Sequence, residues 1–431
     1  MAEARLQPPA AVCDIARRLE QAGYETWCVG GAVRDALLGL PHLDWDLATA
    51  ATPPQVRRLF RRTVPVGEAF GTIGVLDDDG VMHEVTTFRH DVKTDGRHAE
   101  VEFGASLDED LARRDFTINA MAWSPSLSRL HDPFGGRADL ARGVVRAVGD
   151  APTRMAEDRL RALRALRFAA RFGFTIDPQT WNAIVASAPA LHRLSRERIQ
   201  QELVKTLEQV RRPGDALRLW DACGAMRELL PPLAGRAKWQ YRAADQRALP
   251  DASHDDGVAR RRTLVRLGAV VGGLRSDVVR TLLTGLRFSN RDVQRTARIV
   301  EVAGVMVEAL GAPESPSDAT LRRWAAAAQR TDVADALRIA CSLAEAKAPP
   351  SPEARARWLR DYRRAIIVAY RDPVSIADLA VDGEDLARVG VSSGRAVGDT
   401  LRRLLDHVLE HPEDNRMEFL LARVRAWQDS A

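Results

Sequence analysis

Hydrophobic and polar residues follow two different periods along the chain. Within the first 150 positions, strand-like runs occur at residues 25–29, 44–48, 72–76 and 82–88. Helical spacing over Ala32–Leu38 predicts a short helix, and Gly39 supplies the usual stop signal after it. The last two strand-like runs flank the acidic turn Asp77–Gly80, so we expect them to form a hairpin.

From Pro152 onward the period is helical. Apolar residues recur at Leu160, Leu163, Leu166 and Phe168, and similar spacing continues toward the end of the chain. The pattern therefore predicts an α+β protein in which a small mixed sheet with helices precedes a long all-helical part. Breaks are expected where turn residues gather, at 149–152, 212–214, 248–257 and 311–317.

The composition is that of a globular protein. The chain has 431 residues, of which 45% are apolar and 28% charged, and this excludes a disordered chain, a collagen and a disulfide scaffold. No uncharged apolar run reaches the roughly 18 residues of a membrane span. Residues 1–12 lack the features of a secretory signal, and the four cysteines are widely spaced. We therefore expect a cytoplasmic protein with no membrane partner and with free, buried thiols.

Positive charge is concentrated in one stretch of the chain. Residues 151–240 contain 16 Lys and Arg against 9 Asp and Glu, a balance of +7 in a chain whose net charge is only +4. A local basic excess favours a polyanionic partner such as nucleic acid, and a solvated arginine-rich helix face is the alternative.

A glycine pair followed by two aspartates is the most informative local pattern. Gly30-Gly31 ends a predicted strand and opens a predicted helix, where glycines let backbone N–H groups approach a phosphate. Arg34, in the first helical turn, could add a cation. Asp44 and Asp46 lie two residues apart on a predicted strand, so both carboxylates should face the same way. The residues between and beside them, which should face a core, are Leu43, Trp45 and Leu47.

Two carboxylates on one face repel each other unless a cation lies between them, and hard oxygen ligands are those that Mg²⁺ prefers. Taken alone, the glycine pair is also typical of an ordinary turn, and the two aspartates of a solvated strand. Their combination resembles the nucleotidyltransferase superfamily, in which Mg²⁺ activates an attacking hydroxyl and stabilises the leaving pyrophosphate.

A longer resemblance narrows the family. The run VGGAVRDALLGLPHLDWDLAT at 29–49 resembles the first motif of class II tRNA nucleotidyltransferases, the CCA-adding enzymes, and of the related bacterial poly(A) polymerases. Four more motifs of that family follow in order: RRDFTINA at 113–120, DPFGG at 132–136, EDRLR at 157–161 and SRERI at 195–199. The resemblance covers about residues 24–207 and is weak beyond, where LRFSNRD at 286–292 is a faint echo.

The resemblance implies a division of the chain and a set of site residues. It implies a nucleotidyltransferase head at 1–149, a helical neck that selects the nucleotide base at 150–210, a helical body at 211–310 and a tRNA-binding helical tail at 311–431. It assigns Mg²⁺ to Asp44 and Asp46. It assigns nucleotide binding to Gly30, Gly31, Arg34, Arg113, Arg114, Asp115, Asn119, Asp158, Arg161 and Arg164.

The spacing of some of these residues suggests how they would act. Asp115 and Asn119 would share a face if that segment is helical, and in the family this motif contacts the ribose. Asp158 and Arg161 would share one helix face, where an acceptor and a donor could read a base edge. A capped helix start and an intrahelical salt bridge are the structural alternatives for these two pairs.

A third catalytic carboxylate is expected beside the aspartate pair. Glu84 lies on a neighbouring predicted strand, and the alternation of that strand groups it with Thr86 and Phe88, apart from His83 and Val85. Glu84 could therefore share the acidic face. A solvated strand residue is the alternative.

Two further segments bear on the type of enzyme. Residues Arg89–Val101 are polar and contain glycine, and they resemble the mobile loop before the second motif of CCA-adding enzymes, which relatives that add only CC generally lack. A solvated loop is the alternative. His254-Asp255 is not followed by the sequence of an HD phosphohydrolase, so we expect no metal site there.

The sequence thus predicts a template-independent enzyme that adds or repairs the 3′-terminal CCA of tRNA from CTP and ATP. The alternatives are a bacterial poly(A) polymerase, an A-adding enzyme of the same family and a non-catalytic RNA-binding protein. Poly(A) polymerases usually have a Gly-Arg-Arg-Phe-type stretch after the aspartate strand and a basic tail. Here residues 66–72 read VGEAFGT and the chain ends RAWQDSA, which favours CCA addition. No pattern indicates an oligomeric state.

Overall fold

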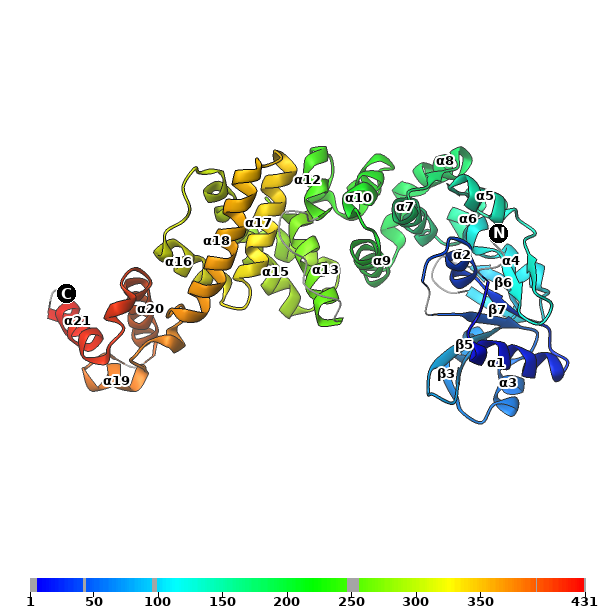
Figure 1. The fold of residues 1–431 in the computed structure, drawn as a ribbon, viewed down its shortest axis with the longest axis horizontal. Coiled ribbons are helices and arrows are strands. Elements are labelled where there is room, and N and C mark those ends of the chain that lie inside the picture. The colour runs from blue at the N-terminus through cyan, green and yellow to red at the C-terminus, as the bar shows by residue number, and fades with distance from the viewer. Residues whose placement is uncertain (1–5, 42–43, 95–98, 246–255, 393, 430–431) are drawn as a thin grey trace. The chain divides into compact units, whose positions relative to one another are not determined.

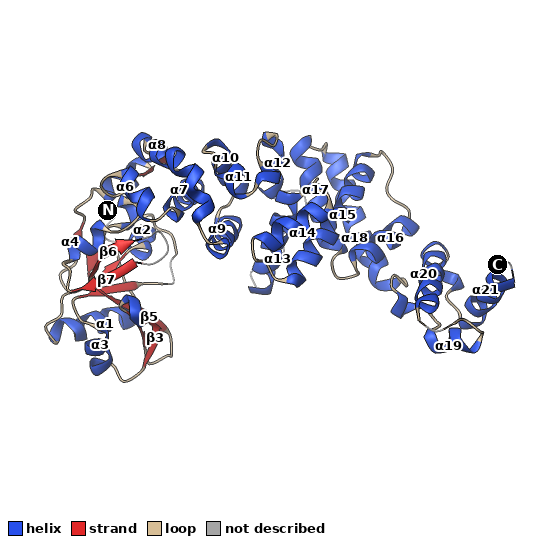
Figure 2. Ribbon diagram, turned by 180° about the vertical axis from the view of Figure 1, so that it is seen from behind, coloured by secondary structure: helices blue, strands red, loops and turns tan. Residues whose placement is uncertain are grey.

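A computed structural model describes residues 6–41, 44–94, 99–245, 256–392 and 394–429 of the chain (Figure 1). The chain divides into two compact units. The first comprises Met1–Glu202 with Leu219–Pro231, and the second comprises Leu203–Arg218 with Pro232–Ala431. The described strands all belong to the first unit, and the second is helical (Figure 2). The predicted order, a mixed α/β head followed by a helical part, is confirmed.

The head is built around one seven-stranded sheet. In spatial order its strands are β3 (Thr63–Gly67), β4 (Thr72–Leu76), β5 (Met82–Thr87), β2 (Asp46–Thr49), β1 (Thr26–Val29), β8 (Ala122–Ser124) and β9 (Arg129–His131). Strands β2 and β5 are parallel, and the other neighbours are antiparallel. The four strands that the hydrophobic pattern predicts are all present, each within two residues of its expected limits.

The alternation of the β2 segment is confirmed by burial. Trp45 is 1% exposed and Leu47 is fully buried, whereas Leu43 lies outside the described residues. The predicted hairpin is β4–β5, and its turn is closed by Asp77, whose Oδ1 accepts a hydrogen bond from the N–H of Val81 at 2.8 Å.

Short helices surround this sheet. They are α1 (Ala10–Gln21), α2 (Gly31–Leu37), α3 (Pro53–Leu59), η2 (Glu68–Phe70), α4 (Leu107–Ala112), η3 (Thr117–Asn119) and α5 (Gly136–Arg142). Helix α2 is the one that the sequence predicts, and Gly39 follows it with a φ of +71°, a conformation that glycine adopts without strain. Trp27, Phe88 and Leu111 belong to the buried cluster that joins the sheet to α4.

The polar segment that was predicted as a loop forms a hairpin instead. Strands β6 (Arg89–Thr94) and β7 (Ala99–Phe103) pair antiparallel, with Arg89 opposite Phe103. A polar composition did not prevent this, because backbone hydrogen bonds pair strands whatever side chains they carry. The connecting residues 95–98 lie outside the described part of the chain.

The first unit continues through helices after the head sheet. These elements are β10 (Val144–Val145), α6 (Ala151–Glu157), α7 (Leu160–Phe172), β11 (Thr175–Ile176), α8 (Pro178–Ser187), η4 (Ala188–Arg193), α9 (Arg196–Gln209), α10 (Pro213–Ala222), α11 (Ala225–Leu229) and η5 (Pro231–Leu233), of which the last residues of α9, the start of α10 and the end of η5 belong to the second unit. Strands β10 and β11 form a small parallel pair.

The second unit consists of packed helices. They are α12 (Lys238–Arg242), η6 (Ala243–Asp245), α13 (Asp256–Val271), α14 (Ser276–Gly285), α15 (Asn290–Gly311), α16 (Asp318–Ala328), α17 (Val333–Lys347), α18 (Pro352–Arg371), η7 (Ile376–Asp378), α19 (Gly383–Arg388), α20 (Arg395–Glu410), η8 (Pro412–Asp414) and α21 (Met417–Asp429). Leu386, Leu404 and Leu420 belong to a separate apolar cluster of the C-terminal helices.

Several expectations about composition can be compared with the structure. None of the described helices has the length and apolar character needed to cross a bilayer. All four cysteines are free, and Cys28, Cys223 and Cys341 are buried as expected, whereas Cys13 is only half-buried. His254-Asp255 lies outside the described residues.

Candidate active site

Asp46 and Glu84 lie side by side on one face of the head sheet. Strands β2 and β5 pair in parallel with Leu47 opposite Val85, so the preceding residue of each strand, Asp46 and Glu84, lies level with the other. Leu47 and Val85 are fully buried, while the two acids are partly exposed on the opposite face. Asp44 is exposed and lies two residues before Asp46.

The surroundings of Asp46, including the other two carboxylates, raise its affinity for protons. Burial, followed by repulsion from Asp44 and Glu84, raises the pKa of Asp46 to about 6, and Arg114 partly opposes this shift. Within the described part of the chain, no hydrogen bond or ion pair engages Asp44, Asp46 or Glu84. The face therefore carries negative charge that the protein itself does not neutralise.

This donor set suits a hard divalent cation. No group of three His, Cys, Asp or Glu side chains converges as a complete metal cage among the residues that the structure describes. Mg²⁺ does not need one, because it usually takes one or two carboxylates and completes its shell with water and substrate phosphates. Asp44 and Asp46, with Glu84 beside them, fit that requirement.

The absence of a side chain at Gly30 allows the guanidinium of Arg114 to approach the acidic face. Its φ of +77° and ψ of −133° form a conformation that side chains disfavour, and a Cβ at this position would lie only 2.8 Å from Nη1 of Arg114. Gly30 follows Val29, which pairs with Asp46 across β1 and β2. Arg114 therefore lies close to both the glycine and the acidic face.

A buried aspartate holds the arginine pair of the second motif. Asp110, 1% exposed, accepts from Nη2 of Arg113 at 2.7 Å and from Nη2 of Arg114 at 3.1 Å. Sequence reasoning did not single out Asp110. Its spacing of three and four residues from the arginines was the signal, since such pairs share one side of a helix.

Arg34, a predicted phosphate-binding residue, is buried and engaged with other side chains of the head. Arg34 is 4% exposed, pairs with Asp35 at 2.6 Å, donates to Oδ1 of Asn119 and lies against the rings of Phe168 and Phe172. Burial lowers the pKa of its guanidinium. A side chain in the first turn of a short helix can point into the core, and the sequence pattern did not show which way.

Asp115 and Asn119 are brought together, although their segment is not an α-helix. Only Thr117–Asn119 forms a 3₁₀ turn, η3, and Nδ2 of Asn119 donates to Oδ1 of Asp115 at 2.9 Å. Oδ2 of Asp115 accepts from Nε of Arg164 at 2.7 Å. Although burial raises the pKa of Asp115, Arg164 and these hydrogen bonds lower it below its ordinary value. Arg34, Asn119, Asp115 and Arg164 therefore form one network from α2 to α7.

The DPFGG motif stabilises this network by packing α5 against η3. Oδ1 of Asp132 accepts from the N–H of Gly136 at 2.7 Å. A Cβ on Gly136 would lie 2.1 Å from the carbonyl oxygen of Thr117, so only glycine permits α5 to approach η3 this closely. Oγ1 of Thr117 donates to Asp139 of α5 at 2.8 Å. The motif fixes the segment that carries Asp115 and Asn119.

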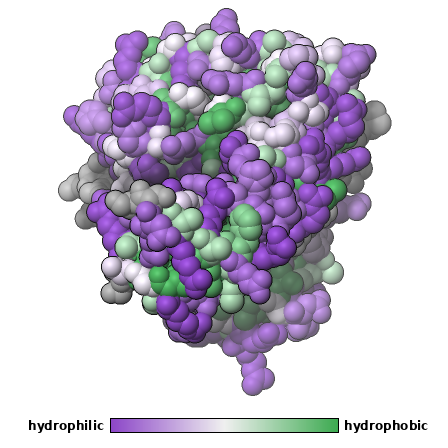
Figure 3. All heavy atoms as spheres, turned by 90° about the vertical axis from the view of Figure 1, so that its left-hand side faces the viewer, coloured by the Kyte–Doolittle hydropathy of each residue, from purple (hydrophilic) through white to green (hydrophobic). Residues whose placement is uncertain are grey.

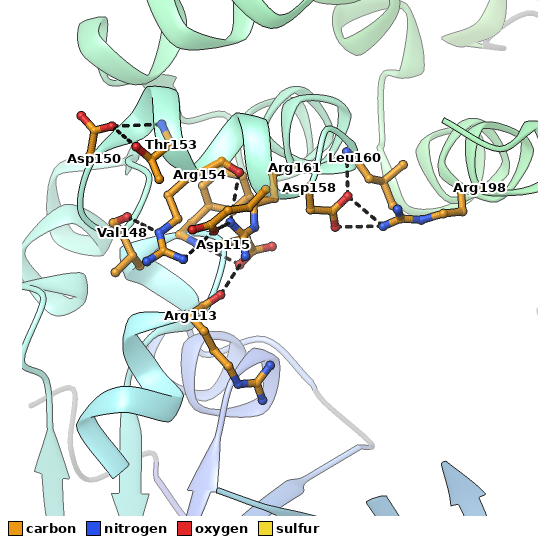
Figure 4. Close-up of polar contacts among 12 residues, drawn as sticks. Arg113, Asp115, Val148, Asp150, Thr153, Arg154, Asp158, Leu160, Arg161 and Arg198 are labelled. Carbon is orange, nitrogen blue, oxygen red and sulfur yellow. Dashed lines mark hydrogen bonds and ion pairs between the residues drawn. The ribbon is translucent and has the colours of Figure 1, made fainter. Parts of the chain in front are cut away.

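Asp158 and Arg161 do not share one helix face, contrary to the prediction. Asp158 has an extended backbone and ends α6, and the next helix, α7, begins at Leu160. Oδ2 of Asp158 accepts from Nη2 of Arg198 at 2.8 Å. Nη1 of Arg161 pairs with Glu157 at 2.7 Å, so the alternative, a salt bridge between Asp158 and Arg161, is not formed either. Figure 4 shows Asp158 directed to Arg198.

Arg161 instead connects the fourth motif to the second. Its Nη2 donates to the carbonyl oxygen of Arg113 at 2.9 Å, as Figure 4 shows. Sequence reasoning recognised the fifth motif but not that Arg198 would pair with Asp158, because α7, β11, α8 and η4 lie between them in the chain. A second cross-link that it missed is the buried pair of Arg167 and Glu202, at 2.5 Å.

Comparison with known proteins gives matches over the whole chain. The family of the poly(A) polymerase head domain matches residues 26–146, and the family described as the probable RNA- and SrmB-binding site of polymerase A matches residues 173–235. A CCA-adding enzyme of Geobacillus stearothermophilus is 35% identical over 432 aligned residues, 98% of this chain and 97% of that one. One of Limosilactobacillus fermentum is 34% identical over 94% of each chain.

Solved structures show the same architecture. The crystal structure of Bacillus stearothermophilus CCA-adding enzyme in complex with CTP is 32% identical, covers 99% of this chain and all of its own, and has a TM-score of 0.78. The Thermotoga maritima CCA-adding enzyme complexed with tRNA, at 21% identity over 98% of each chain and a TM-score of 0.65, shares the fold.

Proposed function

The chain belongs to the family of CCA-adding enzymes, and from this membership we propose that it adds or repairs the 3′-terminal CCA of tRNA. The substrates are CTP, ATP and tRNA, and the product besides the extended RNA is pyrophosphate. A structural relative with CTP bound supports the nucleotide substrate. The observation that carries the catalytic role is the uncompensated acidic face of Asp44, Asp46 and Glu84, with Gly30 and Arg114 beside it.

Asp44 and Asp46 would hold Mg²⁺, with Glu84 as a third acid next to them. When bound there, the ion would lower the pKa of the 3′-hydroxyl of the RNA and neutralise charge on the reacting phosphate. The residues of the chain position the reactants. The backbone N–H groups after Gly30 and the guanidinium of Arg114 would bind the anionic triphosphate. Asp110 already holds Arg114 in position, so this side chain would not need to rearrange when the nucleotide binds.

The ribose and the base of the nucleotide would be held by the network beyond the acidic face. Asp115 and Asn119 offer hydrogen-bonding groups to ribose hydroxyls, and Arg164 keeps Asp115 ionised. Asp158 and Arg198 together present an acceptor and a donor, each about one-third exposed. This pair is better placed to read a base edge than Arg161, which is engaged with Glu157 and with a backbone carbonyl.

The division into head, neck, body and tail at 1–149, 150–210, 211–310 and 311–431 is retained as part of the proposal. So is the cytoplasmic location, which suits an enzyme of tRNA with free thiols. The tRNA-binding role of the helical part is inferred from the relatives. We expect this part to recognise the shape of the tRNA and the charge of its phosphates.

The experiment that tests the function is end-extension of tRNA. Purified full-length protein is incubated with tRNA that ends before CCA, together with CTP, ATP or both. We expect two additions with CTP alone, a third when ATP is present, and then a stop. The family name of the head domain keeps poly(A) polymerase as the second candidate, and continued addition of A would establish it instead.

A matched pair of variants tests the acidic face in the same assay. Asp44→Ala should abolish nucleotide incorporation and leave tRNA binding largely intact, because a carboxylate of the reaction centre is lost and no packing changes. Asp78→Ala, in the exposed β4–β5 turn of the same head, is the control and should behave as wild type. Unchanged incorporation by Asp44→Ala would disprove the role of the acidic face.

A further inference from the structure

The face of the head sheet that bears Glu84 also bears apolar side chains that the described chain covers only in part. On β5, Met82 and Glu84 point to the same side, because the strand alternates between exposed and buried residues. Met82 is 40% exposed and Val66, on the edge strand β3, is 44% exposed. Exposed apolar side chains beside a reaction centre indicate a binding surface for a substrate or a partner.

Gly74 brings these two side chains together. It lies opposite Glu84 in the β4–β5 ladder, so its missing side chain would point to the face of Glu84. A Cβ there would meet Sδ of Met82 at 2.7 Å and Cγ2 of Val66 at 2.9 Å. Met82 and Val66 therefore close over Gly74 and form a continuous apolar surface, which we call the Met82–Val66 platform, next to the carboxylate.

We propose that the Met82–Val66 platform supports the base of the RNA's 3′-terminal nucleotide while its hydroxyl reacts. The inference rests on the proposed function. The nucleotide that carries the reacting hydroxyl must lie on the sheet face that bears Asp46 and Glu84, and its base must then contact a surface within one nucleotide's reach. The base of the incoming nucleotide is assigned to Asp158 and Arg198, which leaves the platform for the RNA end.

The chemistry of the platform fits an RNA end whose identity changes. During three additions the terminal base is first that of the tRNA, then C, then C again. Valine and methionine offer no hydrogen-bond donor, so they cannot distinguish one base from another, whereas every base has a flat face that packs on apolar groups. The sulfur of Met82 adds favourable contact with an aromatic ring. A surface that does not distinguish the bases therefore suits an RNA whose terminal base changes during the three additions.

Phe70, the last residue of η2, and Phe103, the last residue of β7, are a separate pair of apolar side chains near the start of β4. They are 51% and 38% exposed, and Cε1 of Phe103 occupies the space next to Gly71, which follows Phe70. Arg89 donates a hydrogen bond to the carbonyl oxygen of Phe70, which holds this corner in place.

The test compares a shape-conserving double variant with a matched control. Met82→Gln with Val66→Thr keeps the size of both side chains and makes the platform polar; both positions are exposed, so folding should not change. Leu127→Gln, at a 64% exposed position of the turn between β8 and β9, is the control. The readouts are kcat/KM for tRNA and KM for CTP. We expect the double variant to lose about fivefold in kcat/KM for tRNA, with KM for CTP unchanged.

An abasic RNA end makes the test specific. Removing the terminal base should slow wild type by about the same factor, and should slow the double variant little further, because the lost contact is the same one. The three RNA ends, before CCA, after C and after CC, should be affected alike. Independent effects of the variant and the abasic end, a loss confined to one RNA end, or a loss equal to that of the control would each overturn the inference. If wild type extends no tRNA, the proposed function and this inference both fail; if wild type and double variant extend equally, only this inference fails.

Discussion

At the scale of single residues, Asp46 shows that a charged residue of the reaction centre can destabilise the folded protein. Its pKa of about 6, compared with an ordinary value of 3.8, means that the charged form is less favourable in the folded protein than in the unfolded chain. Burial and two neighbouring acids cause this difference. At neutral pH the carboxylate is nevertheless ionised. The folded state therefore holds unfavourable charge that a bound cation would relieve.

Asp46→Asn should accordingly stabilise the metal-free protein while abolishing nucleotide incorporation. The folded-state pKa lies above the unfolded value of 3.8, so wild type is destabilised most above about pH 6, and this penalty fades as the pH falls toward the unfolded value. We expect a gain of about 1–3 kcal/mol for the variant at pH 8, shrinking between pH 6 and 4. Thermal unfolding in EDTA at these pH values measures it. Mg²⁺ should raise the melting temperature of wild type only; equal stability of both proteins at pH 8 would contradict this account.

Arg198 permits a second prediction at this scale. Arg198→Ala removes the partner of Asp158, so the proposed base-reading pair loses its donor. We expect the KM values for CTP and ATP to rise about tenfold, as for loss of a charge-assisted hydrogen bond, and the preference between the two to weaken. Single-nucleotide incorporation assays with each triphosphate measure both effects.

Arg196→Ala is the matched control, because Arg196 is exposed on the same helix. It should leave both KM values unchanged. A tRNA-binding defect with normal nucleotide KM values in Arg198→Ala would show that Arg198 serves the RNA and not the base of the nucleotide.

At the scale of elements, the close approach of α5 to η3 depends on one missing side chain. Gly136→Ala would place a methyl group against the carbonyl of Thr117, and backbone cannot yield as a flexible side chain can. We expect a loss of roughly 1–3 kcal/mol in the free energy of unfolding. Because η3 carries Asn119, catalytic activity should fall more than tRNA affinity does.

Gly304→Ala, in the middle of α15, is the contrasting change. Nothing lies within 4 Å of a Cβ there, so alanine should be neutral or should stabilise the protein by up to about 1 kcal/mol. Chemical denaturation of the two variants beside wild type makes the comparison. Equal stabilities for Gly136→Ala and Gly304→Ala would mean that the α5–η3 contact is not tight in solution.

At the scale of the whole molecule, charge is distributed unevenly over the helical part. Helix α18 has six arginines against two acidic residues, whereas residues 375–431 have 7 Lys and Arg against 11 Asp and Glu. The face that Figure 3 shows is mostly hydrophilic, with hydrophobic residues in small patches. Phosphate attraction should therefore come more from α18 than from the C-terminal helices, which would contact RNA mainly through shape.

Arg360 and Arg363 provide the test of this distribution. Both are exposed on α18, and no hydrogen bond or ion pair engages them within the described residues. The double variant Arg360→Ala with Arg363→Ala should weaken tRNA binding about tenfold at moderate salt and reduce the salt slope by up to about 2, with KM for CTP unchanged. Titrations of labelled tRNA at several salt concentrations measure it. Arg275→Ala, exposed and paired with Asp277, is the control; an unchanged slope in the double variant would assign the RNA contact elsewhere.

The sequence by itself determined the elements and the order of the motifs. Four strands of the head, the short helix before Gly39 and the helical remainder follow from spacing between near neighbours, which local geometry enforces. The same rule predicted that Trp45 is buried between Asp44 and Asp46, although strand β2 begins only at Asp46, so that Asp44 lies just before it. The family followed from the motif order, and the relatives confirm it.

Only the tertiary structure decided which of these residues meet. The parallel register of β2 and β5 places Glu84 beside Asp46, Arg34 turns into the core to hold Asn119, and Asp158 pairs with Arg198, 40 residues away. These partners are distant in sequence, and they come together because burial of apolar faces packs the elements that carry them. Spacing along a chain can show which residues share a face, but which face meets which is decided by the packing of the whole unit.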